Sequence, residues 1–261
     1  MPCRTIAVAN QKGGTGKTAT TLNLGIALAR LGKRVLLVDT DPQGDLTKSL
    51  GWKDTDALGM TLANHLNAVI EGEALEPHEG MFSHKEGVDL MPANIELAGM
   101  EMPALMAMSR EWLLDAWVSP LKTDYDFIIF DCAPTLGIIP VNAFVASDSV
   151  LIPVSAEYLP ASAMTELLKT IGHVRRQINP TLSVEGILLT LSDRRNNLAR
   201  EIEGAIREQY GSACRVFDTV IPRAVSAAEA PSVGVSIFAY DARGKVASAF
   251  TQLAEEVMCD D

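Results

Sequence analysis

Short apolar runs alternate along the chain with longer segments of helical periodicity. Continuous rather than alternating apolar runs indicate strands that are buried on both faces, as in a parallel sheet. Such runs predict strands at 5–9, 34–39, 88–92, 127–131, 149–153, 185–190 and 217–221. The segments between them predict helices at about 17–31, 57–71, 96–117, 162–178, 195–210 and 243–258. This alternation predicts an α/β fold, a doubly wound and mostly parallel sheet with helices on both faces.

No internal repeat or low-complexity linker interrupts the alternation, so we expect residues 1–261 to form a single domain. Residues 51–90 have the weakest pattern and are predicted to be a variable surface excursion. Because no run of about 18 apolar residues and no signal-peptide pattern occurs, we expect no transmembrane helix and a cytoplasmic location. The four cysteines form no C-x-x-C pair, which argues against a disulfide framework or a zinc ribbon.

Charge is distributed unevenly. The net charge of −11 argues against a protein that binds nucleic acid constitutively. Residues 51–130 carry 4 basic and 14 acidic side chains, whereas 1–50 carry 7 basic and 3 acidic ones. Four methionines lie within 100–108; core packing is the expected role for them, and an exposed groove for a partner is the alternative.

A glycine-rich loop lies between the strand at 5–9 and the first helix. Residues 12–18 read Lys-Gly-Gly-Thr-Gly-Lys-Thr, a phosphate-loop pattern in which Gln11 replaces the first glycine. All three glycines can take positive φ and let backbone N–H groups wrap phosphates, while Lys17 reaches the β- and γ-phosphates and Thr18 binds Mg²⁺. The predicted nucleotide-binding residues here are Lys12, Gly13, Gly14, Thr15, Gly16, Lys17, Thr18 and Ala19.

Two strand ends supply acidic residues. Asp39 ends the run at 34–39 and Asp41 follows two residues later, and Asp131 ends the run at 127–131 in a Walker B pattern. Carboxylates at the carboxyl edge of a parallel sheet lie where α/β proteins bind ligands. Asp131 is therefore predicted to hold Mg²⁺ through water. The next residue is Cys132, not Glu, which disfavours ATPases that carry their general base directly after Walker B.

Several stretches resemble one family, the ParA/Soj branch of the deviant Walker A ATPases. The first is Lys12 at the loop entry, the position of that family's signature lysine. The others are residues 10–14, 41–44, 131–137, 148–154, 193–198, 220–223 and 229–232. Ala133 stands where the family usually has proline in the switch II segment, residues 131–137.

The resemblance implies a DNA-partition ATPase that uses ATP and Mg²⁺. Lys12 would reach across an ATP-dependent homodimer, Asp41 would position the attacking water, and Asp39 would join the magnesium shell. Lys12, Lys17 and Asp41 are then the expected catalytic residues. The dimer would bind DNA without sequence preference, and a ParB-like partner would stimulate an otherwise slow hydrolysis and release it.

The DNA-binding surface is expected around the predicted helix at 195–210, and the family's arginine near Arg195 is present. A second family arginine is Ser226 here. Pro222 and Arg223 are the expected adenine-pocket residues. The predicted DNA-binding residues are Arg194, Arg195, Arg200 and Arg207.

Four alternatives remain. One is an ATPase of this type that positions a protein cargo instead of DNA, and another is a nucleotide switch that binds no DNA, which the serine at 226 keeps open. A MinD-like membrane-cycling ATPase is disfavoured because the acidic end at 254–261 would be repelled by an anionic bilayer. An iron–sulfur reductase is disfavoured because neither Cys132 nor Cys214 lies in a recognisable ligand position.

Overall fold

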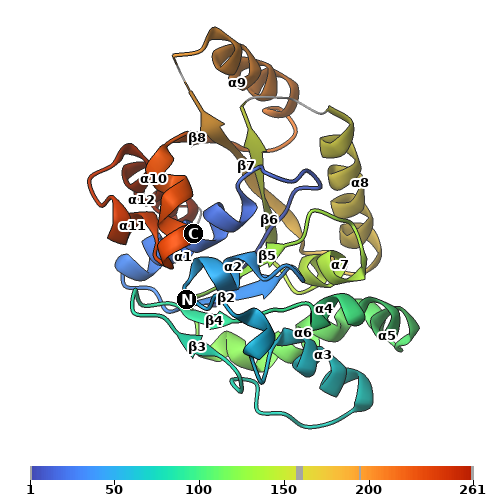
Figure 1. Cartoon of the computed structure of the whole chain (residues 1–261). Coiled ribbons are helices and arrows are strands. Elements are labelled where there is room, and N and C mark those ends of the chain that lie inside the picture. The colour runs from blue at the N-terminus through green and yellow to red at the C-terminus, as the bar shows by residue number, and fades with distance from the viewer. Residues whose placement is uncertain (1, 157–160, 194, 260–261) are drawn as a thin grey trace.

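The computed structural model describes residues 2–156, 161–193 and 195–259. In this part of the chain an eight-stranded sheet runs in the order β3-β4-β2-β5-β1-β6-β7-β8 (Figure 1). All neighbouring strands pair in parallel except β3, which is antiparallel to β4. The strands are β1 (Arg4–Val8), β2 (Val35–Thr40), β3 (Phe82–Ser83), β4 (Asp89–Met91), β5 (Phe127–Cys132), β6 (Ser149–Ser155), β7 (Ser183–Ser192) and β8 (Val216–Pro222).

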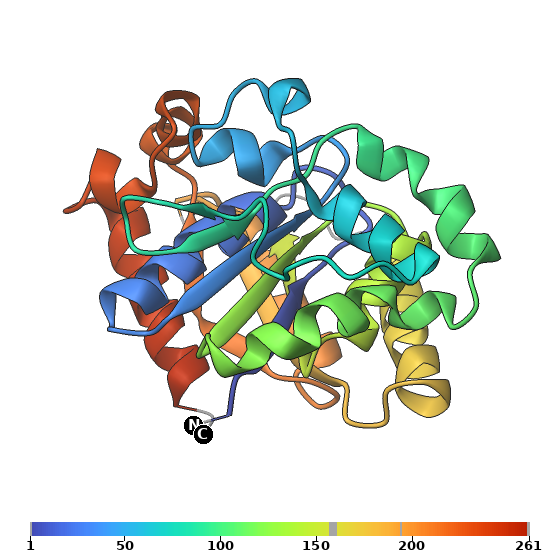
Figure 2. The same ribbon diagram turned by 90° about the horizontal axis from the view of Figure 1, so that it is seen from below.

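Helices cover both faces of the sheet (Figure 2), which confirms the predicted fold class. Side chains alternate between the faces along each strand: Ile6 and Val8 of β1 join the core under α1, α2, α11 and α12, whereas Ala7 faces the core under α3–α9. The helices are α1 (Lys17–Arg30), α2 (Asp45–Ser49), α3 (Leu62–Glu71), α4 (Glu96–Gly99), α5 (Glu101–Met106), α6 (Leu113–Val118), α7 (Ile138–Val145), α8 (Ala161–Gln177), α9 (Asn197–Tyr210), α10 (Val225–Glu229), α11 (Ile237–Tyr240) and α12 (Lys245–Met258).

The segment 51–90 is not the surface excursion that its weak pattern predicts. Leu62, Ala63 and Leu66 of α3 are buried in the core, and β3 pairs with β4 at the edge of the sheet. The pattern is weak because α3 spans only ten residues and the segment otherwise holds turns, a three-residue 3₁₀ helix, the two-residue β3 and the start of β4.

Two helical predictions also need correction. The single helix predicted at 96–117 is three short helices, α4, α5 and α6, because Gly99 ends the first and Ser109 takes a left-handed conformation at φ 54° between the other two. Helix α7 is absent from the sequence prediction because it is apolar on nearly every side and so has no amphipathic period. Its Pro140 lies in the first turn, where a missing N–H does no harm.

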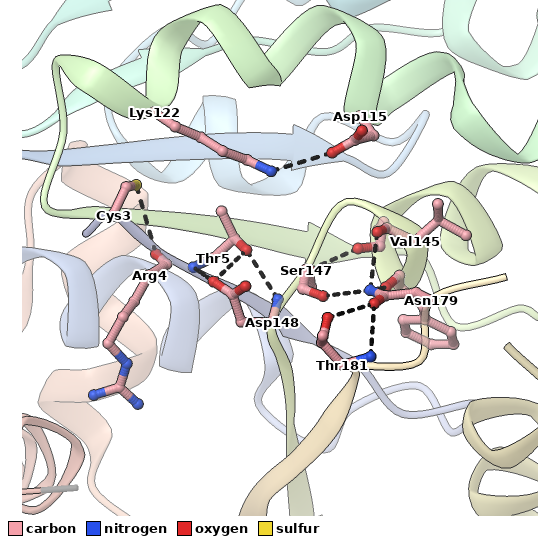
Figure 3. A network of polar contacts seen from close by, with 12 residues as sticks. Cys3, Arg4, Thr5, Asp115, Lys122, Val145, Ser147, Asp148, Asn179 and Thr181 are labelled. Carbon is pink, nitrogen blue, oxygen red and sulfur yellow. Dashed lines mark hydrogen bonds and ion pairs between the residues drawn. The ribbon is translucent and has the colours of Figure 1, made fainter. Parts of the chain in front are cut away.

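Polar contacts fix the amino ends of the central strands (Figure 3). Asp148, just before β6, accepts hydrogen bonds of 2.8 Å from both the backbone N–H and the hydroxyl of Thr5. The Asn179 amide donates to the carbonyls of Val145 and Ser147 at 3.0 and 2.8 Å. These contacts hold β1 and β6 in register, which leaves the opposite, carboxyl ends of the strands to form the site.

Candidate functional site

The glycine-rich loop joins β1 to α1 at the carboxyl edge of the sheet. Gly14 and Gly16 take positive φ of 72° and 85°, where a side chain would be strained, but Gly13 does not, contrary to the expectation for all three. The loop is anchored from two neighbouring strands. Asn10 donates to the Pro153 carbonyl of β6 at 2.7 Å and accepts from the Lys12 N–H, and the Thr190 hydroxyl of β7 donates to the Thr15 carbonyl.

Lys17 begins α1 with its ammonium group held inside the loop. The side chain is buried, and Nζ donates to the Lys12 carbonyl at 3.3 Å. Burial lowers the pKa of Lys17, and the nearby carboxylates, Asp131 foremost, oppose that shift. A buried cation whose hydrogen bond goes to a neutral carbonyl is suited to an anion brought from outside. Lys12 lies at the entry of the same loop and is half-buried.

Asp39 and Asp131 lie side by side on adjacent strands. They are paired in register between β2 and β5, and both are fully buried. Burial raises the pKa of Asp39 to about 7. The pKa of Asp131 is raised well above its usual value, first by burial and then by the charge of Asp39, against the opposing effect of Thr18 and Lys17. Two buried carboxylates that lie side by side favour the binding of a cation, because each raises the cost of ionising the other.

The two carboxylates differ in how many of their oxygens already accept hydrogen bonds. Asp39 Oδ2 accepts from both the N–H and the hydroxyl of Thr47, and its Oδ1 accepts from the Asp41 N–H. Asp131 Oδ1 accepts from the Thr21 hydroxyl at 3.2 Å, whereas its buried Oδ2 has no hydrogen-bond partner. Such an orphaned oxygen beside Thr18 fits a magnesium ion bound through water, so Asp131 is better placed for that role than Asp39.

Within the described residues, no three His, Cys, Asp or Glu side chains form a metal cluster. A Mg²⁺ site built on a nucleotide does not need such a cluster, because that ion takes few protein ligands and relies on phosphate oxygens and water. Asp41 lies in the turn after β2, where its Oδ1 accepts from the Gln43 N–H at 2.9 Å, and it is half-exposed. The turn closes at Gly44, which takes a φ of 64°.

An apolar cavity of about 400 Å³ opens beside the loop, and both predicted adenine-pocket residues, Pro222 and Arg223, line it. The sequence does not predict most of the other residues that line this cavity. Leu191 has a φ of 53°, rare for this residue type, and Thr20 has a buried hydroxyl without a partner. No sequence signal marks these positions. Other lining residues are Asn23, Ile221, Val246 and Phe250.

A second, larger cleft of about 820 Å³ adjoins this cavity at the carboxyl ends of β7 and β8 and the start of α12. Its lining includes four cations, Arg195, Arg223, Arg243 and Lys245, and one carboxylate, Asp193. Arg195 is almost fully exposed and pairs with Asp193 at 3.0 Å. Arg243 and Lys245, which sequence reasoning missed, flank Gly244 at the first turn of α12 and are both exposed.

Of the other predicted DNA-binding arginines, Arg200 and Arg207 do not line this cleft. Arg194 lies outside the described residues. Arg200 bonds to the Asn197 side chain on α9, and Arg207 donates to the Phe217 carbonyl at 2.8 Å, which ties α9 to β8. Ser226 donates to the Asp241 carboxylate at 3.2 Å. The structure therefore brings together Arg195 and Arg223, and it gives Arg207 a structural contact.

Known proteins share both the sequence and this arrangement. A family model described as an AAA domain matches residues 3–184. Sporulation initiation inhibitor protein Soj of Bacillus subtilis is 41% identical over 97% of this chain and 97% of its own length. Chromosome partitioning protein ParA of Caulobacter vibrioides is 38% identical over 98% of this chain and 94% of its own. This chain belongs to the ParA/Soj family of partitioning ATPases.

A solved structure of similar sequence shares the fold of this chain. It is described as cobyrinic acid a,c-diamide synthase from Mycobacterium smegmatis with bound ADP and magnesium. The two chains are 37% identical and superimpose with a TM-score of 0.82 over 97% of this chain and 93% of the other.

Two alternatives to a ParA/Soj ATPase can be set against the structure. In a MinD-like cycle the last helix would lie on a membrane, but the apolar face of α12, including Phe250, Leu253 and Val257, is buried against the core. No helix among the described residues is long and apolar enough to span a bilayer. Cys132 is buried, which raises the pKa of its thiol to about 12, so it is poorly suited to act as a thiolate ligand.

Proposed function

We propose that this chain is a nucleotide-controlled DNA-partition ATPase. It binds ATP with Mg²⁺, forms a sandwich dimer through Lys12, binds DNA without sequence preference, and is released by partner-stimulated hydrolysis. Its place of action is the nucleoid. The family assignment supports the ATPase, and the arrangement of cavities supports the coupling to DNA.

The phosphate loop and its acidic neighbours support ATP as the nucleotide. Backbone N–H groups around Gly14 and Gly16 and the start of α1 would face the phosphates, and Lys17 would neutralise them. Thr18 and Asp131 would hold Mg²⁺, which when bound draws charge from the β- and γ-phosphate oxygens. Thr20, Leu191 and Pro222 would enclose the base in the 400 Å³ cavity.

Slow hydrolysis follows from the residues available near the phosphates. Asp41 is the half-exposed carboxylate of the loop after β2, whereas Asp39 and Asp131 are buried and already engaged or aimed at the metal. Asp41 would orient the attacking water when the dimer closes over it. A single orienting group gives little turnover on its own, so a partner that completes the site controls the rate.

The link to DNA rests on one observation: the apolar cavity and the basic cleft have two lining residues in common. Pro222 and Arg223 line both the apolar cavity and the basic cleft, so a nucleotide in one adjusts the wall of the other. The cleft brings four cations together with the N-terminus of the 14-residue α12. Phosphate groups of a DNA backbone match that charge.

Binding to a non-specific duplex tests this proposal. With about 100 mM salt and Mg-ATP we expect binding, with Mg-ADP or no nucleotide we expect little, and Arg243→Glu with Lys245→Glu should weaken it more than tenfold. If a dimer makes about four phosphate contacts, the affinity falls roughly 150-fold from 50 to 200 mM salt.

Arg200→Glu with Lys169→Glu is the matched control, because both residues are exposed cations outside the cleft. This double variant makes the same change of charge and should cost several-fold less affinity. Equal losses in both variants would contradict a DNA site in the cleft, and no binding in any nucleotide state would contradict the DNA-partition function.

A further inference from the structure

Helix α5 exposes an apolar surface where core packing was expected. Of the methionines in 100–108 only Met100 is buried, while Met102 is 66% exposed, Met106 81% and Met108 95%. Leu105 adds a further exposed side chain, at 43%. Exposed apolar side chains that gather on one element mark an interaction site, and methionine adapts its shape to what it meets.

A groove of about 430 Å³ runs beside this surface, between α5, α7 and α8. Glu101 and Leu105 line it from α5; because they are four residues apart they share a helix face, next to the face of Met102 and Met106. Its floor is apolar, and its size suits a few side chains of a short segment. The floor residues are Leu136, Ile138, Val141, Val174 and Ile178.

The charge on the rim indicates the chemistry of the occupant. Glu101 has no ion pair in the described part of the chain, whereas the one arginine on the rim, Arg110, is paired with Glu111 at 2.8 Å. His173 is the other titratable residue in the lining. The rim residues Glu101, Arg110 and Glu111 lie within 51–130, the strongly acidic part of the chain. A segment with apolar side chains and a Lys or Arg therefore fits, and a nucleic acid does not.

The groove is continuous with the segment that follows Asp131. Leu136 and Ile138 of its floor bracket Gly137, the end of the switch II segment. Glu101 lies against this glycine so closely that a Cβ atom placed there would be 3.1 Å from Glu101 Oε1. A partner cation that draws Glu101 outward would free the loop leading back to Asp131.

We propose that this groove, with Met102 and Met106 beside it, binds an apolar and basic segment of the partner protein, and that binding there triggers hydrolysis through switch II. The inference rests on the proposed function, since it assumes partner-stimulated hydrolysis. It adds the docking site, the chemistry of the docking segment and the route to the phosphates.

Stimulated ATPase activity tests the route, with a purified ParB-like protein as the probe. Met106→Asp should leave basal hydrolysis unchanged and reduce stimulation about tenfold. Glu101→Lys removes the carboxylate that lies against Gly137, so it should raise basal hydrolysis and leave little further stimulation. Ile95→Asp and Glu71→Lys make the same chemical changes at exposed positions outside the groove and should keep full stimulation. Equal effects in both pairs would overturn the proposal.

Methyl signals of the methionines give a direct readout of docking. With the partner and Mg-ATP present, the Met102 and Met106 signals should shift while the signal of buried Met91 does not. Unshifted signals during full stimulation would overturn the docking site. Loss of ATP-dependent dimers in Met106→Asp would overturn it too, by assigning the surface to a second copy of the chain. Absence of stimulation in the unaltered protein would instead contradict the proposed function.

Discussion

The apolar cavity with its phosphate loop and the basic cleft adjoin each other, yet they handle charge in opposite ways. At the loop, Lys17, Asp39 and Asp131 are at most 7% exposed, and each has few neighbours that can balance its charge. In the cleft, Arg195, Arg243 and Lys245 are exposed to water. The loop is a site in which every charge must be matched by one particular group. The cleft is a surface on which charges add up and salt screens them.

This difference determines how large an effect we expect from each substitution. Removing a buried charge leaves another buried charge unbalanced, which is costly, whereas removing one exposed cation changes only one of several similar contacts.

Lys17→Ala should have the largest effect. The variant loses the buried cation that faces the phosphates and leaves Asp39 and Asp131 uncompensated, so ATP binding should weaken by about 100-fold or more. Calorimetry with Mg-ATP measures this. Lys12→Ala is the matched control, because it removes a lysine from the same loop and should keep ATP binding while losing the dimer. Tight ATP binding by Lys17→Ala would refute the phosphate-loop assignment.

Asp41→Ala should leave ATP-dependent dimers intact and slow stimulated hydrolysis by about 100-fold or more, since it removes the group proposed to orient water. Phosphate release and light scattering measure the two properties separately. Asp45→Ala removes an exposed carboxylate four residues later and should turn over normally. Normal turnover in Asp41→Ala would remove this residue from the mechanism.

Ser226→Arg should raise the affinity for DNA only a few-fold. The new cation would lie beside Asp241, which would take up part of its charge, so DNA affinity with Mg-ATP should rise about two- to fivefold. The slope of log affinity against log salt should steepen by at most about 0.9. Ser232→Arg, on the exposed turn after α10, is the control. A large gain in both variants would indicate non-specific attraction rather than the cleft.

The smallest effect concerns stability and involves neither site. Burial lowers the pKa of His84 at the β3–β4 turn, so the folded chain favours the neutral ring. The unfolded chain then binds more protons below its pKa near 6.5, and stability falls as the pH drops through that value. His84→Gln should reduce the loss of Tm between pH 7.5 and 5.5 by about 1–3 °C. An unchanged dependence of Tm on pH in His84→Gln would show that other groups cause the loss of stability at low pH.

The sequence predicts the phosphate-loop site far better than the cleft, and the reason is physical. Buried strands that end in Asp39 and Asp131, and glycines that must take positive φ, leave a pattern in the order of residues. Arg195 and Arg243 line one cleft only because the fold brings the carboxyl end of β7 near the start of α12. The place of Arg207 on the predicted helix at 195–210 favours a DNA contact, whereas its hydrogen bond to the Phe217 carbonyl depends on where β8 lies.

The position of β1 in the sheet has a consequence for how the chain is made. A ribosome produces β1 and the phosphate loop first, but β1 pairs with β5 and β6, which begin only at Phe127 and Ser149. At about 5–20 residues per second, roughly 6–25 s pass between the synthesis of β1 and that of β5, its first neighbour. The nascent chain therefore carries the nucleotide loop without the strands that support it until half of the protein has been synthesised. A messenger truncated before β5 yields a chain that cannot assemble the site at all.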